Sequence, residues 1–136
     1  MTEDLPLVME PADLARRLED EHLLILDLSK AQVYEQAHVP GAVHLDHSRL
    51  VHGEQPVPGL PPSPEELSAL FSELGLRPDL HVVAYDDEGG GWAGRLLWTL
   101  ELIGHKHWAY LNGGIHAWLA ANHPSTTVPG EPRPSQ

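Results

Sequence analysis

The chain is 136 residues long, which suits one domain large enough to bury about two thirds of its unfolded surface. It holds 8 Lys and Arg against 20 Asp and Glu, a net charge of −12 with His neutral, so nucleic acid and anionic membranes are poor partners. The absence of cysteine excludes disulfides, iron–sulfur clusters and thiolate zinc sites.

No targeting or membrane segment is recognisable in the sequence. No apolar run approaches the ~18 residues of a membrane span. The acidic first residues do not form the basic start of a secretory signal. The excess of acidic residues has a plain explanation as well, because net charge keeps a protein in solution. We therefore expect a soluble cytoplasmic protein.

The chain begins with short helix and strand patterns. Residues 5–9 fit an edge strand, and Pro11 fits the first position of an amphipathic helix that runs to Asp20. The apolar run at 23–26 is typical of a parallel strand covered on both faces, and Asp27 ends it. We interpret Asp27 as a carboxylate that braces the next loop, with a functional role as the alternative.

A sharp turn separates a predicted helix at 31–37 from a predicted strand at 42–45. Tyr34 lies in the helix. The turn contains His38, Pro40 and Gly41. His38 could hydrogen-bond a backbone carbonyl and lock this turn, or it could titrate as an acid or base.

A long irregular excursion and a capped helix follow. Residues 53–64 hold five prolines and two glycines in twelve residues, which excludes both a helix and a central strand. Ser63 fits the N-cap of the next helix, with Pro64 at its first position and Glu66 as the capping-box partner. Gly75 ends this helix.

The stretch from His81 to Trp118 carries the strongest pattern. It predicts a strand at 81–85, a loop at 86–91, a helix at 92–103, a strand at 107–111 and a glycine turn into a last helix. Loops at the carboxyl ends of parallel strands form the ligand sites of open α/β sheets. The loop consists of Asp86, Asp87, Glu88, Gly89, Gly90 and Gly91. Arg95 follows it and either pairs with Asp86 or Asp87 or contacts an anion or a neighbouring domain.

Within the helix at 92–103 one apolar face is clear. Its members are Trp92, Leu96, Leu100 and Ile103. Trp98 lies off this face, and we expect it in the core rather than at an interface. After the last helix, residues 124–136 hold four prolines in thirteen residues. We therefore expect a domain at 1–123 followed by a proline-rich linker or disordered tail at 124–136.

These motifs together resemble the rhodanese (sulfurtransferase) family. The second half of the chain matches the family pattern VVxYD, AxRLxW, GH, a strand, NGG and AW. The first half matches the family motif D…Y…GHIPGA, in which Ala37 replaces the usual glycine and Val39 replaces the isoleucine. The match spans roughly residues 23–119 and is most similar to the N-terminal domain of tandem thiosulfate sulfurtransferases. It implies a three-layer α/β fold with a mainly parallel sheet of about five strands flanked by helices on both faces. It assigns structural roles to Asp27, Tyr34, His38, Pro40, Gly41, Asn112, Gly113 and Gly114.

The resemblance also implies a chemistry that this chain does not support. An active rhodanese carries a cysteine at the start of the loop after its central strand and holds sulfur there as a persulfide, stabilised by backbone N–H groups. The matching position here is Asp86, or Asp87, and a carboxylate forms no persulfide. We therefore expect no catalytic residue in this chain and an inactive, vestigial loop.

Two functions fit this expectation. The first is the non-catalytic N-terminal half of a thiosulfate:cyanide sulfurtransferase, whose partner is a C-terminal catalytic rhodanese domain of the same polypeptide. The alternative is a stand-alone inactive module that binds or regulates a protein. A rhodanese-related phosphatase would also need the cysteine.

No cofactor or metal is expected, because the histidines lack zinc-site spacing. The G-x-G-x-x-G pattern formed by Gly89, Gly91 and Gly94 lies beside carboxylates that oppose pyrophosphate.

Overall fold

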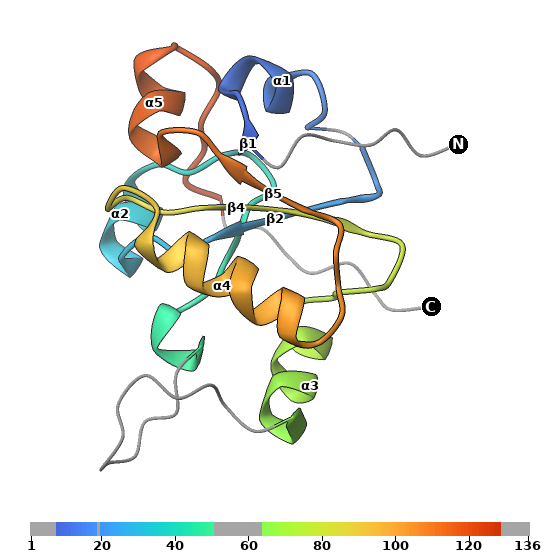
Figure 1. Cartoon of the computed structure of the whole chain (residues 1–136). Helices are drawn as coiled ribbons and strands as arrows, with labels where there is room; N and C mark the ends of the chain where they lie inside the picture. Colours follow the sequence, from blue (N-terminus) through green and yellow to red (C-terminus); the bar gives the residue numbers. More distant parts are fainter. Residues whose placement is uncertain (1–7, 19, 51–63, 129–136) are drawn as a thin grey trace.

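The structure, a computed structural model, describes residues 8–18, 20–50 and 64–128. Its centre is a five-stranded parallel sheet with the strand order β1-β5-β4-β2-β3 (Figure 1). The strands are β1 (Val8–Met9), β2 (Leu23–Asp27), β3 (Val43–His44), β4 (His81–Tyr85) and β5 (Trp108–Leu111). The helices are α1 (Pro11–Ala15), α2 (Ala31–Gln36), α3 (Pro64–Glu73), α4 (Gly91–Leu102) and α5 (Gly114–Ala120), with a 3-10 turn, η1 (His47–Leu50).

The sheet is covered by helices on both faces, which confirms the expected three-layer α/β fold. Figure 1 shows α3 and α4 on one side of the sheet and α1 and α5 on the other. Side chains alternate between the faces along each strand. In β2, Leu24 and Leu26 join the cluster under α3 and α4, whereas Leu23 and Ile25 join the cluster under α1, α2 and α5.

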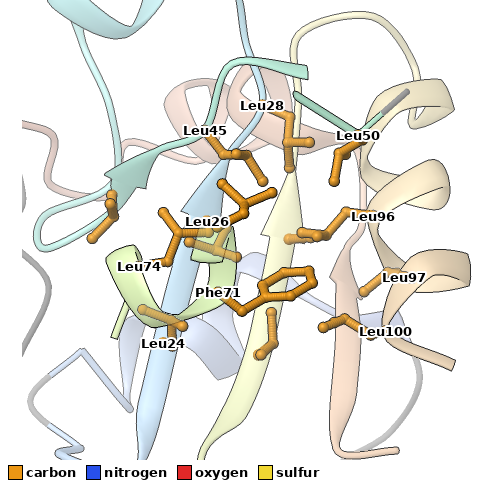
Figure 2. Packing of buried hydrophobic residues seen from close by; sticks show 14 of the residues in the cluster. Leu24, Leu26, Leu28, Leu45, Leu50, Phe71, Leu74, Leu96, Leu97 and Leu100 are labelled. Atoms are coloured by element: carbon orange, nitrogen blue, oxygen red, sulfur yellow. The ribbon is translucent and has the colours of Figure 1, made fainter. Parts of the chain in front are cut away.

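The core between the sheet and the helices α3 and α4 is built mainly from leucine. Figure 2 shows Leu24 and Leu26 of β2 packed with Phe71 and Leu74 of α3. Three leucines of α4 close the same cluster from the side; they are Leu96, Leu97 and Leu100. Because β4 is central and buried on both faces, the loop that follows it starts from a rigid base.

Helix α4 differs from the sequence prediction in its buried face. Trp98 was expected in the core, but its side chain is 45% exposed, and Ile103 lies beyond the helix and is 43% exposed. Leu96 and Leu100 are buried as expected, and the other buried positions of the helix are Ala93, Leu97 and Thr99. The helical period defines faces of the helix, but the neighbouring strands and η1 decide which face is covered.

The N-terminal helix is shorter than expected. Helix α1 ends at Ala15 instead of Asp20, and the chain continues in turns, with the Arg17 N–H donating to the Leu14 carbonyl at 2.8 Å. Residues 5–7 of the expected edge strand and residues 53–63 of the proline-rich excursion, including the proposed N-cap Ser63, lie outside the described residues.

Residues 124–128 lie against the domain, and we call them the C-terminal strap. The Trp118 indole Nε1–H donates to the Pro124 carbonyl at 2.7 Å. His38 and Thr126 form an antiparallel bridge through two backbone hydrogen bonds of 3.0 and 2.9 Å. Hydrogen bonds to the domain therefore continue past residue 123, and residues 129–136 of the expected linker lie outside the described part.

Candidate functional site: a loop closed around its own carboxylate

The loop after β4 curls around the side chain of Asp86. The Asp86 Oδ1 atom accepts the N–H groups of Glu88 and Gly90 at 3.0 and 2.9 Å. The Oδ2 atom accepts the N–H groups of Trp92 and Ala93 at 3.1 and 2.9 Å. Asp86 is only 1% exposed. Four backbone donors of the loop and of the first turn of α4 thus converge on one buried anion, an arrangement that we call the cradle.

Two glycines give the cradle its curvature. Gly89 and Gly90 have φ values of +88° and +102°, a conformation that residues with a Cβ atom rarely adopt. A Cβ atom on Gly90 would also lie 3.0 Å from the Tyr110 hydroxyl oxygen. Gly90 caps α4 at its N-terminus, where the first N–H groups have no partner inside the helix and the dipole favours negative charge. The Asp86 carboxylate accepts hydrogen bonds from these N–H groups and also places a negative charge at the N-terminus of the helix.

The turn between β5 and α5 closes the other side of the loop. Gly114 approaches so closely that a Cβ atom there would lie 2.3 Å from the Asp86 carbonyl oxygen, and the Ile115 N–H donates to the same oxygen at 3.2 Å. The His116 Nε2 atom lies 3.1 Å from the Asp87 carbonyl oxygen. The acidic loop and the NGG turn, two separate motifs in the sequence, are therefore one unit in space.

Asn112, the first residue of the NGG turn, fastens this unit to the edge strand. Its N–H donates to the Met9 carbonyl at 2.9 Å. Its side-chain amide donates to both oxygens of the Glu10 carboxylate at 3.0 and 3.3 Å. Asn112 therefore acts on the position of the turn and not on the contents of the cradle.

Asp27 braces the loop after β2. Its Oδ1 atom accepts the Ser29 N–H at 2.7 Å. Burial raises the pKa of the Asp27 carboxyl above its usual value, with hydrogen bonds from Tyr85 and Ser29 opposing the shift. The Tyr85 hydroxyl in turn accepts the Val39 N–H at 3.1 Å, and burial raises the pKa of that phenol. Asp27 is thereby linked to the turn at 38–41 through a buried tyrosine.

The remaining motif residues of the first half fix that turn. The Tyr34 hydroxyl donates to the Ala42 carbonyl at 2.6 Å, and the Tyr34 ring stacks on His38 with a centroid distance of 3.7 Å. Pro40 and Gly41 line a cavity of about 50 Å³ near the start of β2 and an open depression of about 490 Å³ beside α1. These residues shape the turn and lie outside the cradle.

The contacts described for Arg95 lead away from the cradle. Its guanidinium carbon lies 4.7 Å from the centre of the Trp98 ring, and its Nη2 atom lies 3.4 Å from the Leu50 carbonyl oxygen. A basic residue outside the sequence motifs contacts the loop. Lys30 pairs with Glu88 at 3.4 Å. The sequence feature that could have indicated this contact is the position of Lys30 just after β2, at the same edge of the sheet as the loop.

Tyr110 is the other loop neighbour that the sequence did not reveal. Its ring lies against Gly90, and burial raises the pKa of its hydroxyl, with the negative charge of Asp86 as a second cause.

Among residues 8–18, 20–50 and 64–128, no group of three or more His, Asp or Glu side chains is placed to hold a metal ion. None of the helices described there is long and apolar enough to cross a membrane. The cradle can thus hold one anion, and its own carboxylate already occupies it.

The parallel sheet, the glycine-rich loop with inward-pointing N–H groups and the docked NGG turn define a rhodanese-like domain. The family model described as the rhodanese-like domain matches residues 10–121. The chain belongs to the rhodanese family.

Among its relatives are two bacterial proteins named thiosulfate sulfurtransferase. The one from Pseudomonas aeruginosa is 55% identical over 117 residues, which cover 86% of this chain and 43% of the relative. The one from Azotobacter vinelandii is 52% identical over 120 residues, which cover 88% of this chain and 44% of the relative. The chain thus spans less than half the length of these relatives.

A solved structure supports the same assignment. The crystal structure of SseA from Escherichia coli, described with the 3-mercaptopyruvate sulfotransferases, superposes with a TM-score of 0.86 at 26% sequence identity. The superposition covers 97% of this chain and 54% of that one.

Proposed function

We propose that this chain is a non-catalytic rhodanese domain, the N-terminal half of a tandem thiosulfate:cyanide sulfurtransferase. The observation that carries the proposal is the Asp86 carboxylate, which fills the cradle with four backbone hydrogen bonds. The names of the two bacterial relatives and their greater length support the same reading.

The chemistry of sulfur transfer explains why the cradle cannot work alone. A thiolate attacks the sulfane sulfur of thiosulfate, the S–S bond of thiosulfate breaks, and sulfite leaves while a persulfide forms. Cyanide then takes the outer sulfur as thiocyanate and regenerates the thiolate. A carboxylate oxygen forms no such persulfide, and this chain contains no cysteine. The nucleophile of our proposal therefore lies in a second, C-terminal rhodanese domain of the same polypeptide.

The test compares thiosulfate:cyanide activity of two proteins. We expect the purified 136-residue chain to form thiocyanate no faster than buffer. We expect the polypeptide encoded by the native gene, read past the codon for Gln136, to turn over and to contain a cysteine in its second loop. Turnover by the 136-residue chain would overturn the assignment of a silent domain. A gene that stops after Gln136 would overturn the assignment of a tandem enzyme.

The alternative is an inactive module that binds another protein. The observation that favours it is the outer face of α4, where the side chains of Trp98 and Leu102 are 45% and 53% exposed. If the gene stops after Gln136, this face is the first to examine, by the variant Trp98→Ser in a binding assay.

A further inference from the structure

Helix α4 is apolar on the side that faces solvent as well as on the side that faces the sheet. Its buried side contacts β4, β5 and η1 (Figure 1). On the opposite side, Trp98 and Leu102 are 45% and 53% exposed, and Ile103, directly after the helix, is 43% exposed. A surface helix carries polar residues on the side away from the core, whereas a helix that is apolar all round is covered on both sides.

These three exposed residues lie together, within residues 98–103. The other large apolar side chains that are exposed in the described part of the chain belong to three different segments; they are Val8 of β1, Leu119 of α5 and Val128 after α5. Exposed apolar residues that are scattered singly need no explanation, but a group on one face marks a site of interaction. The group on α4 is therefore the one that calls for a covering surface.

Gly94 adds an independent observation on the same side of the helix. It lies one turn before Trp98, and residues four apart share a helix face. Glycine in the interior of a helix is less stable than alanine. A Cβ atom at this position would meet nothing within 4 Å, so nothing that surrounds Gly94 in the described part of the chain requires a glycine. A second surface that approaches closely beside the Trp98 ring would require it.

The charges around α4 also differ from those of the rest of the chain. Of the 20 Asp and Glu residues, only Glu101 lies within residues 89–128. Its carboxylate accepts the Trp108 indole Nε1–H at 2.7 Å and pairs with Lys106 at 3.4 Å. The Arg95 guanidinium carbon lies 4.7 Å from the centre of the Trp98 ring. A centre of Trp and Arg with few acidic residues and a polar rim is typical of a protein–protein interface.

The length of the bacterial relatives indicates what covers this side of the helix. The matched 117 and 120 residues are 43% and 44% of the two thiosulfate sulfurtransferases, so more than half of each relative lies outside the match. A second copy of this chain is a poorer occupant, because two chains that each carry a charge of −12 repel each other.

We propose that the outer face of α4, formed by Gly94, Arg95, Trp98, Leu102 and Ile103, is the docking surface for the C-terminal half of the tandem polypeptide. The covering surface is apolar and approaches most closely at Gly94, with Trp98 as the central side chain of the contact. This inference rests on the proposed tandem arrangement and adds the face on which its two halves meet.

Hydroxyl-radical footprinting of the polypeptide encoded by the native gene tests the docking surface. Radicals oxidise leucine side chains according to their contact with water, and mass spectrometry locates the products. In this domain Leu102 is 53% exposed and Leu119 is 40% exposed, so an uncovered Leu102 is oxidised at least as fast as Leu119. We expect Leu102 to be oxidised several-fold more slowly than Leu119. Equal or faster oxidation of Leu102 would overturn the inference.

A charge placed on the outer face of α4 provides the second measurement. Leu102→Lys puts an ammonium group at a position that is half exposed in this domain, so the domain tolerates it, whereas a covered apolar face does not. We expect the oxidation of Trp98 in the full polypeptide to rise several-fold in Leu102→Lys and to keep the wild-type rate in the matched control Leu119→Lys. An unchanged rate in Leu102→Lys, or an equal rise in both variants, would contradict the docking surface.

The docking surface and the tandem arrangement fail in different ways. A native gene that stops after Gln136 overturns the tandem arrangement and removes the proposed occupant with it. A longer gene whose product leaves Leu102 as accessible as Leu119 overturns the docking surface alone. Protection of Leu102 that appears only as the protein concentration rises would identify a second copy of the polypeptide as the occupant and would also overturn this inference.

Discussion

Asp86 shows how a single side chain can stand in for a bound anion. Its two oxygens take four N–H groups that a curled loop and a helix N-terminus would otherwise leave without partners. Since this anion is covalently part of the chain, the loop keeps its curvature without a ligand.

The variant Asp86→Cys tests whether the cradle is otherwise complete. We expect its thiol to ionise readily at the N-terminus of α4 and to take one sulfur atom from thiosulfate, seen as a gain of about 32 Da in the intact mass. The reaction should be slow, because Asp87 and Glu88 repel a dianion, and the additional change Glu88→Gln should accelerate it.

The matched control is Asp87→Cys, one residue further along the loop. The four N–H donors of the cradle bond to the side chain of residue 86 and not to that of residue 87. We therefore expect little stable sulfur uptake by this variant. Equal uptake by Asp86→Cys and Asp87→Cys, or none by Asp86→Cys, would show that the cradle around Asp86 is not suited to a persulfide.

The direction of the Asp86 side chain could not be obtained from the sequence. The pattern located the loop at the end of β4 and its two candidate positions, Asp86 and Asp87. Whether a carboxylate turns inward depends on the positive φ angles of Gly89 and Gly90 and on the approach of Gly114, which a chain of three glycines permits but does not dictate. Contacts between distant segments decide it.

Replacing a glycine by alanine should have opposite effects on stability at Gly114 and at Gly94. Gly114 begins α5 with φ +58°, and a Cβ atom there would meet the Asp86 carbonyl oxygen at 2.3 Å. We expect Gly114→Ala to lower the free energy of unfolding by about 2–4 kcal/mol, because it adds strain and separates the turn from the cradle. Urea unfolding monitored by circular dichroism measures this loss.

The control is Gly94→Ala, in the interior of α4. A Cβ atom there meets nothing within 4 Å. Alanine favours helix more than glycine does, so we expect a gain of about 0.5–1 kcal/mol. If Gly114→Ala is as stable as the wild type, the close approach of the NGG turn to the loop is wrong.

The opposite end of the sheet contains three neighbouring histidines, and burial of two of them, His81 and His105, makes the fold sensitive to acid. His81 begins β4, and its ring centroid lies 6.3 Å from that of His107, which lies 6.1 Å from that of His105. Burial, followed by the charges of His107 and His105, lowers the pKa of His81 from 6.5 to about 4. Burial also lowers the pKa of His105.

The sign of the resulting pH dependence follows from proton binding. Between about pH 6.5 and 4 the unfolded chain protonates His81 and the folded chain does not, so stability is complete above pH 6.5 and is lost as the pH falls toward 4. Asp27, with its raised pKa, acts in the opposite sense. We expect His81→Phe to flatten the loss of stability in this window, measured by urea unfolding at several pH values.

The comparison for His81→Phe is His116→Asn, a change at an exposed histidine of α5. We expect it to keep the wild-type pH dependence between pH 4 and 6.5. An equal slope in His81→Phe and the wild type would contradict the assignment of the acid sensitivity to this end of the sheet.

The elements themselves were largely predictable, because local patterns carry them. Buried parallel strands such as β2 and β4 are continuous apolar runs, and their expected bounds at 23–27 and 81–85 agree with the structure. The exposure of Trp98 was not predictable in the same way. It depends on which side of α4 the sheet and η1 occupy, and helical periodicity contains no information on that choice.

At the scale of the whole molecule, the net charge of −12 governs how stability responds to salt. Ion pairs such as Lys30–Glu88 and Lys106–Glu101 join exposed partners, and such pairs stabilise a protein weakly. The excess acidic charge repels itself more strongly in the compact state than in the unfolded chain. Raising NaCl from about 0.01 to 0.15 M shortens the screening length from about 30 to 8 Å and should relieve this repulsion.

We therefore expect the unfolding temperature at pH 7 to rise by several degrees over this range, since ~1 kcal/mol shifts the midpoint of a domain of this size by roughly 2–6 °C. Near the sequence pI of about 5.1 the net charge and its repulsion disappear, while the ion pairs are still screened. The salt effect should vanish or change sign there. Calorimetry at the two pH values makes the comparison, and a fall in unfolding temperature with salt at pH 7 would show that the individual ion pairs outweigh the net charge.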